Sequence, residues 1–256
     1  MPKVLLWDIE TSLQPVAVFQ LAHNDWIDPS AILEERYIIC ASWKWLGEKT
    51  VHSVSVLDDP KRYKKDPPDD RHVVQALHAA LSQADVLVHH NGDSFDKRYL
   101  DTRILAHGLD PLPPIATIDT YKIAKQKFLF NSNKLDYIGQ FLGLGRKIST
   151  TPGLWMKVLN GSKTAIQEMV AYNIQDVHLL EKVFRALEAY LPPHFNRQLY
   201  AEAECCPKCG STHLQSRGLY AALTKTYRRF QCQSCRGWLR SLIPAPSTRP
   251  LTHRPL

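Results

Sequence analysis

The stretch VLLWDIETS, residues 4–12, places four apolar residues directly before two acids, Asp8 and Glu10. A short, continuous apolar run is typical of a strand in a sheet that is covered on both faces. Side chains alternate along a strand, so Asp8 and Glu10 point to the same face. Such a pair also occurs at ordinary strand ends, where acids meet solvent. Two ionised carboxylates beside a buried strand nevertheless favour a nearby cation.

The pattern that follows predicts an α/β domain with a mixed sheet. Residues 37–45 and 50–57 have the composition of two further strands joined as a hairpin, and residues 84–91 and 113–120 each carry another. Residues 58–72 are charged and rich in proline, which predicts a solvated loop. Helical periodicity marks residues 72–84, 94–109, 134–144 and 163–191. We therefore expect a five-stranded mixed sheet with flanking helices.

The composition is that of an ordinary globular protein. The chain has 256 residues, of which 44% are hydrophobic and 22% are charged. No apolar run approaches the ~18 residues that a membrane-spanning helix needs. The N-terminus lacks the features of a signal peptide, because its apolar run is short and acids follow at once. We expect a cytoplasmic protein without a membrane partner.

The net charge is concentrated at one end of the chain. Residues 1–199 contain 23 Lys and Arg and 23 Asp and Glu, whereas residues 200–256 contain nine and two. The formal net charge of +7 therefore lies entirely in the C-terminal segment. This asymmetry predicts a neutral body with an appendage that binds a polyanion.

Two later segments carry acids that could join the first pair. Asp96 follows the strand expected at residues 84–91, and it would lie near Asp8 if that strand neighbours the first. Tyr172 and Asp176 are four residues apart, so they share one face of the predicted helix. Asp176 is either an acid on the helix surface or an acid within a buried stripe, which then needs a bound partner. The pattern favours a site where the three segments converge.

Three motifs resemble the exonuclease motifs of the DEDD 3′–5′ exonucleases, which have a ribonuclease H-like fold. They are Asp8-x-Glu10, Asn91-x3-Phe95-Asp96 and Tyr172-x3-Asp176. The tyrosine resembles the DEDDy branch, since the other branch has a histidine where this chain has Ala171. The segments WDIET, VHHNGDSFD and MVAYNIQDV are similar to the proofreading domain of family B DNA polymerases and its stand-alone relatives. The resemblance covers about residues 1–190.

The resemblance implies a site for two Mg²⁺ or Mn²⁺ ions that hydrolyses phosphodiesters. Such ions prefer hard oxygen ligands and stabilise charge on both the attacking and the leaving oxygen. Asp8 would bridge both ions, Glu10 and Asp176 would complete one site, and Asp96 would act on the second ion through water. Tyr172 would orient the attacking water, because its ordinary pKa of ~10 makes it a poor base. Core packing is the alternative for Tyr172.

Three residues beside these motifs are candidates for contact with the terminal nucleotide. The resemblance places Thr11 at the 3′ end, through its backbone amide or hydroxyl. Asn91 and Phe95 would touch the terminal nucleotide, with Phe95 packing on a base or sugar. For Phe95, burial in the core is the alternative. We do not assign Asp119 to the site, because it equally suits the N-cap of a helix.

The cysteines indicate a metal site near the C-terminus. Cys206-x2-Cys209 and Cys232-x2-Cys235 are separated by 22 residues, a spacing typical of a tetrahedral four-thiolate zinc site. With this spacing, Cys205 is not one of the four predicted zinc ligands. Residues 203–243 resemble a zinc ribbon, and a unit this small needs the metal for its folding energy. We divide the chain into an exonuclease domain, a zinc ribbon and a disordered Pro-rich tail: residues 1–195, 203–243 and 244–256.

Between the two cysteine pairs, basic and aromatic residues are interleaved. Single-stranded nucleic acid is bound by such combinations, which offer cations to phosphates and rings to bases. We expect phosphate contacts from Lys225, Arg228 and Arg229. The alternative is that the aromatic residues fill the small core of the ribbon while the basic residues are merely solvated. The aromatic residues are Tyr220, Tyr227, Phe230 and Trp238.

The sequence thus predicts a metal-dependent 3′–5′ exonuclease that acts on the 3′ ends of single-stranded DNA. Its expected cofactors are two Mg²⁺ or Mn²⁺ ions and one structural Zn²⁺. An exoribonuclease is the alternative within the same class. A non-catalytic module that binds nucleic acid or a replication partner is the alternative from another class. The ribbon could also dock on a protein partner, such as a polymerase or another replication or repair protein.

Overall fold

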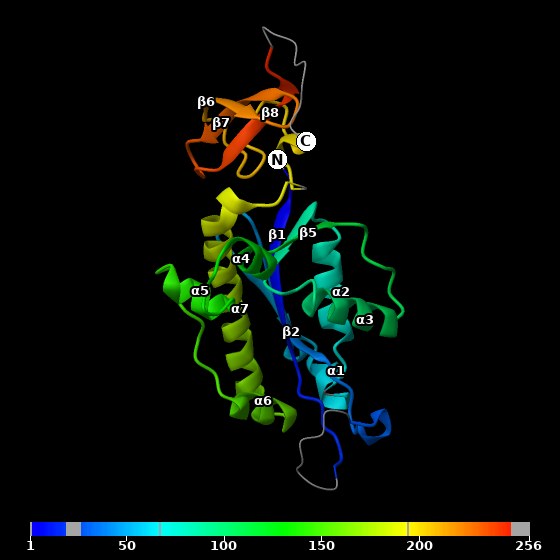
Figure 1. The fold of residues 1–256 in the computed structure, drawn as a ribbon. Helices are drawn as coiled ribbons and strands as arrows, with labels where there is room; N and C mark the ends of the chain where they lie inside the picture. The colour runs from blue at the N-terminus through cyan, green and yellow to red at the C-terminus, as the bar shows by residue number, and fades with distance from the viewer. Residues whose placement is uncertain (1, 19–26, 67, 194, 247–256) are drawn as a thin grey trace.

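Strand β1 (Val4–Thr11) is the central strand of a five-stranded sheet (Figure 1). The structure is a computed structural model that describes residues 2–18, 27–66, 68–193 and 195–246. Leu5, Leu6 and Trp7 are completely buried, as expected for a strand covered on both faces. The strand order is β3-β2-β1-β4-β5.

The strand pairing makes the sheet mixed, as predicted. Strand β2 (Ile38–Trp45) pairs antiparallel with β1, and β3 (His52–Ser55) pairs antiparallel with β2, which confirms the predicted hairpin. Strands β4 (Val86–His89) and β5 (Ala116–Asp119) extend the other side in parallel. Because β4 pairs with β1, the chain leaves β4 beside the carboxylates that end β1.

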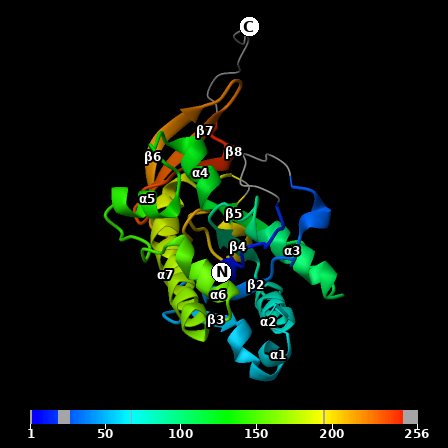
Figure 2. The same ribbon diagram turned by 90° about the horizontal axis from the view of Figure 1, so that it is seen from below.

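Helices cover both faces of this sheet. They are α1 (Pro60–Lys65), α2 (Arg71–Leu81), α3 (Asp96–Ala106), α4 (Thr120–Lys127), α5 (Leu135–Phe141), α6 (Pro152–Leu159) and α7 (Lys163–Leu187). Figures 1 and 2 show α2 and α3 on one side of the sheet and α5 and α7 on the other. The fold is the five-stranded mixed sheet with flanking helices that the sequence predicted.

Alternation along β1 divides its side chains between two cores. Leu5, Trp7 and Ile9 pack in one cluster with residues of α2 and α3. Val4 and Leu6 pack in the other with residues of α4, α5 and the C-terminal half of α7. Asp8 and Glu10 share the second face. The strand therefore directs both carboxylates toward α7.

One predicted loop contains a helix. Residues 58–72 include α1, which begins with Pro60 at its first position. The Asp59 side chain accepts a hydrogen bond from the backbone amide of Arg62 at 3.0 Å, a standard N-cap contact. Buried Tyr63 fixes the short helix to the core. The charge and proline content of this segment concealed these local signals.

A second, three-stranded sheet follows α7. Its antiparallel strands are β6 (Leu214–Ala221), β7 (Thr226–Cys232) and β8 (Trp238–Pro244). In Figure 1 this sheet lies beyond the C-terminal end of α7. Pro244, predicted to begin a disordered tail, instead ends β8. The rest of that prediction falls mainly on residues 247–256, outside the described residues.

Arg197 connects the segment that follows α7 to the cysteine-containing loop that precedes β6. Its guanidinium donates to Glu188 Oε1 at 3.0 Å and to the carbonyl oxygen of Cys209 at 3.0 Å. The Lys208 ammonium donates to the carbonyl oxygen of Ala189. The second sheet is therefore attached at the end of α7. Among the described residues, no helix has the length and apolar character needed to cross a bilayer.

Candidate active site

Three carboxylates from distant parts of the sequence converge between β1 and α7. One oxygen from each of Asp8, Glu10 and Asp176 lies within 4.8 Å of the others. Asp176 is buried on the face of α7 that packs on the sheet, at 1% exposure. Asp8 and Glu10 are only partly buried. The cluster therefore has a protected side and a side open to solvent.

Asp96 lies at the edge of this cluster. It is the first residue of α3, directly after the turn that follows β4, and it is buried. Its carboxylate is close enough to raise the pKa of Asp8, and the backbone amide of Ile9 stabilises its charged form. The structure thus brings all four predicted acids together, with Asp96 outside the tight group of three.

Burial and mutual repulsion make these acids difficult to ionise. Burial raises the pKa of Asp8 well above its usual range, and the charges of Asp96, Glu10 and Asp176 raise it further. Burial, followed by the charge of Asp176, raises the pKa of Glu10 to about 8. Like charges at this separation favour a bound cation or a bound proton.

The atoms present fit a divalent cation. Asp176 Oδ1 is buried and has no hydrogen-bond partner among the described residues. An unpaired buried carboxylate oxygen is costly unless something coordinates it. The neighbouring donors are also carboxylates, the hard oxygen ligands that Mg²⁺ and Mn²⁺ prefer. Asp8, Glu10 and Asp176 would hold one such ion directly, with Asp96 beside a second.

Lys147 is a member of the site that sequence reasoning missed. It lies in the irregular segment between α5 and α6, and its ammonium donates to Asp176 Oδ2 at 2.5 Å and to the Tyr172 hydroxyl at 3.1 Å. Burial lowers the pKa of Lys147, but the charges of Asp176 and Asp8 outweigh that effect and raise it. Lys147 therefore supplies the cation that balances the acids in this structure.

Asn173 was also missed, although the sequence carried a signal for it. Its side-chain amide donates to Asp8 Oδ2 at 2.7 Å, and the residue is completely buried. Asn173 and Asp176 are three apart and face the same side of α7. A polar residue beside Asp176 in the buried stripe could have been recognised by the same reasoning.

The Tyr172 hydroxyl lies beside Asp176 in this site. The residue is buried apart from 8% of its surface, and its hydroxyl accepts the hydrogen bond from Lys147. Burial, followed by the charge of Asp176, raises the pKa of Tyr172 to about 12. The hydroxyl therefore stays protonated at neutral pH and can orient a water molecule but not act as a base.

Replacing Lys147 by Gln should destabilise the metal-free protein and have less effect on the metal-bound protein. Removing one partner of a buried ion pair costs ~3–5 kcal/mol, and because the Lys147 side chain is 29% exposed we expect about 2 kcal/mol. Divalent ions would replace the lost charge. Thermal melting with and without Mn²⁺ measures this difference, and Lys147→Arg is the matched control. An equal loss of stability in both states would contradict the assigned role.

Two of the three candidate contacts for the terminal nucleotide directly adjoin acids of the cluster, since Thr11 follows Glu10 and Phe95 precedes Asp96. Thr11 ends β1 and is partly buried, and Asn91 is exposed with a φ of 65°. The backbone amide of Asn91 donates to Asp119 Oδ1 at 2.8 Å, and Asp119 also caps α4, as its alternative assignment required. Phe95 is 38% exposed and stacks on Tyr99, so it is a surface ring rather than a core residue.

The two adjacent histidines point to different partners. His89 Nε2 lies 2.9 Å from Asp93 Oδ1, whereas His90 is bonded to the Thr120 hydroxyl and the Asn133 carbonyl. They do not form a joint metal site. His89 and Asp93 do approach Asp119, but the ammonium of Lys122 already pairs with Asp93.

The four cysteines of the two predicted pairs meet at one point. The Sγ atoms of Cys206, Cys209, Cys232 and Cys235 all lie within 4.8 Å of one another. The Sγ–Sγ distances of 3.8 Å between Cys206 and Cys235, and 3.6 Å between Cys209 and Cys232, exceed a disulfide bond of ~2.05 Å. Four convergent thiols of this kind suit tetrahedral zinc.

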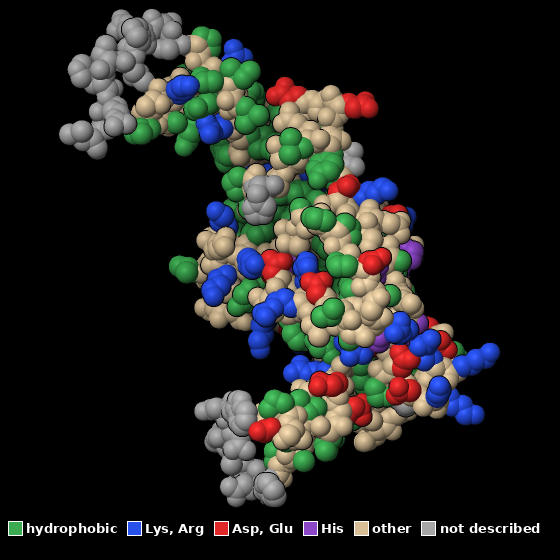
Figure 3. Space-filling model, turned by 90° about the vertical axis from the view of Figure 1, so that its right-hand side faces the viewer, with side chains coloured by type: hydrophobic (Ala, Val, Ile, Leu, Met, Phe, Trp, Pro, Cys, Tyr) green, Lys and Arg blue, Asp and Glu red, His purple; other side chains and the backbone are tan. Residues whose placement is uncertain are grey.

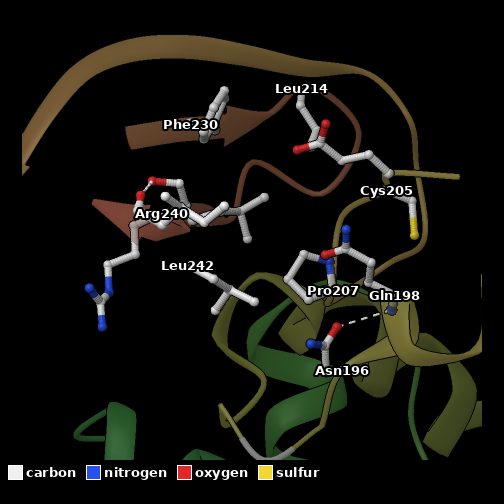
Figure 4. Close-up of a pocket in the computed structure, with 12 residues that line it drawn as sticks. Asn196, Gln198, Cys205, Pro207, Leu214, Phe230, Arg240 and Leu242 are labelled. Carbon is white, nitrogen blue, oxygen red and sulfur yellow. Dashed lines mark hydrogen bonds between the residues drawn. The ribbon is translucent and has the colours of Figure 1, made fainter. Parts of the chain in front are cut away.

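Cys205 is separate from the thiol cluster. It lines a hollow of about 310 Å³ between the second sheet and the chain that precedes it (Figure 4). Pro207, Phe230 and Leu242 line the same hollow. None of the four predicted catalytic acids is among its lining residues, so we assign it no role in catalysis.

Comparison with known proteins identifies the family. A model of the RNase H superfamily matches residues 46–188, more than half of the chain. The chain belongs to the RNase H superfamily. The matched range contains Asp96, Tyr172 and Asp176, whereas β1 with Asp8 and Glu10 precedes it.

A solved structure shares the fold of this RNase H superfamily member. It is the family B DNA polymerase from the hyperthermophilic archaeon Pyrobaculum calidifontis, with a TM-score of 0.53 and 16% sequence identity. The similarity covers 74% of this chain and 26% of the polymerase, so the chain corresponds to about a quarter of that protein. At this identity the likeness shows the fold alone. None of the curated protein sequences matches the chain.

Proposed function

We propose that this chain is a metal-dependent 3′–5′ exonuclease that removes nucleotides from the 3′ end of single-stranded DNA. The observation that carries the proposal is the convergence of Asp8 and Glu10 with Asp176, whose buried Oδ1 lacks a partner. Phosphodiester hydrolysis is the chemistry for which paired divalent ions held by carboxylates are suited. The family and the fold are consistent with it.

The reaction consumes one water molecule and breaks the bond between phosphorus and the 3′ oxygen. A bond forms between the water oxygen and phosphorus, which yields a nucleoside 5′-monophosphate and a strand shortened by one nucleotide. Mg²⁺ or Mn²⁺, when bound, would stabilise the charge on the attacking and leaving oxygens. The Tyr172 hydroxyl orients the water, and the Lys147 ammonium holds that hydroxyl in place.

The remaining residues fix the geometry of the substrate and of the acids. Asn173 holds one oxygen of Asp8, so the other oxygen would be free to bind a divalent ion. We propose that Thr11 and Asn91 contact the terminal nucleotide. Phe95, whose ring is exposed, would pack on its base or sugar.

The second sheet completes the proposed organisation of the chain. We propose that Cys206, Cys209, Cys232 and Cys235 bind one structural Zn²⁺ in a ribbon that spans residues 203–243. The ribbon would assist nucleic-acid binding through basic side chains. Lys225, Arg228 and Arg229 are all exposed, as phosphate contacts require. Residues 1–195 would form the exonuclease domain.

A comparison of substrates tests this proposal. DNA and RNA of matched sequence are offered to the protein as single and double strands with Mg²⁺ or Mn²⁺. We expect the rate of nucleotide release to be highest for single-stranded DNA. The 3′ end must separate from its complement to reach the carboxylates, so duplexes should react more slowly. Faster digestion of RNA would establish the exoribonuclease alternative. No digestion of any substrate would support a non-catalytic binding module.

A further inference from the structure

One face of the three-stranded sheet gathers aromatic rings and arginines. We call it the outer face, and it consists of Tyr220, Tyr227, Arg229, Trp238 and Arg240. Arg229 pairs with Arg240 across β7 and β8, and Gln231 pairs with Trp238, so the register places these side chains on the same side. Tyr220 on β6 pairs with Tyr227 on β7.

The arginines of the outer face lie against its rings. The Arg240 guanidinium carbon is 4.1 Å from the ring centre of Tyr227 and 5.7 Å from that of Tyr220. The Arg229 guanidinium carbon is 5.0 Å from the ring centre of Trp238, and this group also donates to the carbonyl oxygen of Arg217. These contacts orient both guanidinium groups alongside the aromatic surfaces.

Two of the three aromatic rings of the outer face are open to solvent, and Tyr227 is half-buried. Trp238 is 51% exposed and Tyr220 is 45% exposed, although large rings are usually buried when they serve only a core. Together with Arg229 and Arg240 they border a shallow hollow of about 310 Å³. A hollow bounded by exposed rings and guanidinium groups suits a ligand whose flat rings can stack and whose backbone is anionic.

The charge of the ribbon specifies the kind of partner. Residues 205–246 contain seven Lys and Arg and no Asp or Glu. Figure 3 shows Lys and Arg side chains among hydrophobic ones over this part of the molecule, at the top of the view. The Arg240 guanidinium packs on the rings of Tyr220 and Tyr227 and keeps its positive charge. The outer face is therefore complementary to an anion.

Alternation along β7 separates the outer face from the opposite one. Arg228 and Phe230 point away from Arg229, because neighbouring strand residues face opposite sides. Phe230 accordingly lines the hollow next to Cys205 that faces the rest of the chain. Of the three basic residues predicted to contact phosphate, Arg229 is therefore the one that lies beside the exposed rings.

We propose that the outer face is a stacking surface for single-stranded nucleic acid, on which an unpaired base packs against Trp238 and Tyr220 while Arg229 and Arg240 meet adjacent phosphates. This inference rests on the proposal that the chain acts on nucleic acid. Asp176 lies eleven residues before Leu187, the last residue of α7, which is roughly 16 Å at a rise of about 1.5 Å per residue, and the ribbon is attached beyond that end of the helix. The outer face therefore holds nucleotides upstream of the 3′ end rather than the reacting nucleotide.

Binding measurements that separate bases from phosphates test the inference. The full chain carrying Asp8→Ala is titrated with oligothymidylate and with an abasic phosphodiester of equal length, so that neither ligand is hydrolysed. Added Trp238→Leu should weaken oligothymidylate binding about 5- to 100-fold and change abasic binding by less than about twofold. Added Arg240→Gln should weaken both, with a shallower salt dependence. The zinc content of each variant is measured alongside.

Controls keep the outcome decisive. Arg236→Gln removes an exposed positive charge outside the outer face and should weaken binding less than Arg240→Gln does. Phe141→Leu removes an exposed ring on α5 and should weaken oligothymidylate binding less than Trp238→Leu does. If Trp238→Leu loses zinc, Tyr220→Leu replaces it as the ring variant. Unchanged oligothymidylate binding in the zinc-bound ring variant would overturn the inference, as would equal effects of Arg236→Gln and Arg240→Gln. Because no hydrolysis is measured, failure here is distinct from failure of the proposed activity.

Discussion

Replacing Asp8 by Asn should lower the rate of nucleotide release by about 10³-fold at saturating Mg²⁺, since divalent ions supply several kcal/mol of charge stabilisation and each ~1.4 kcal/mol is tenfold in rate. Asp8 is the acid that faces all the others: the charges of Asp96, Glu10 and Asp176 each raise its pKa. Asn keeps the size of the side chain but cannot supply the charge that holds a divalent ion.

The same substitution should stabilise the fold when no metal is present. Asn relieves the repulsion among the acids, so we expect the metal-free melting temperature to rise by several degrees. Added Mn²⁺ should raise the melting temperature of the wild-type protein more than that of the variant. Asp101→Asn, in which the half-exposed side chain on α3 pairs only with Lys97 on the same helix, is the matched control and should change neither activity nor metal response. An Asp8→Asn protein of full activity would refute the assignment of the site.

Replacing Cys206 by Ser should remove the zinc and unfold the ribbon. Structural zinc contributes about 10–16 kcal/mol of binding free energy in zinc-finger peptides, which a unit of this size cannot replace with a hydrophobic core. Serine is a poor ligand in a four-thiolate site. We expect loss of the bound zinc by metal analysis, loss of the strand signal of β6–β8, and increased proteolysis after residue 200.

The adjacent cysteine provides an internal control for the zinc site. Cys205 is as buried as Cys206 but lies outside the thiol cluster, so Cys205→Ser should retain one zinc ion per chain. Release of a nucleotide from a dinucleotide should survive Cys206→Ser, because Asp176 lies in the middle of α7, away from the C-terminal end where the ribbon is attached. Equal zinc loss in both variants would place the metal ligands elsewhere.

The sequence predicted the parts of the site that depend on regular structure. Asp8 and Glu10 were recognisable because two acids follow an apolar run that is typical of a covered strand, and alternation along that strand then places both on one face. Asp176 was recognisable because it interrupts the apolar stripe of a long helix. In each case a local repeat determines the direction of the side chain, so a charged residue in a buried position stands out.

The parts that were missed depend on the path of irregular segments. Lys147 reaches Asp176 from the connection between α5 and α6, where no repeat fixes the direction of a side chain. The arrangement of the outer face depends on strand register, and alternation separates Arg228 from Arg229 although both are basic and adjacent. Helix α1 depends on the N-cap of Asp59 within a segment whose composition resembles a loop.

The most direct test of the central claim is the fate of a label at each end of a single-stranded DNA oligonucleotide. With Mg²⁺ or Mn²⁺, a 3′ label should be released at once as a nucleoside monophosphate, while a 5′-labelled strand should shorten stepwise. Both processes should require metal and fail with Asp8→Asn. Release of the 5′ label first, internal cleavage, or hydrolysis that persists in the Asp8→Asn protein would contradict a 3′–5′ exonuclease built on Asp8, Glu10 and Asp176.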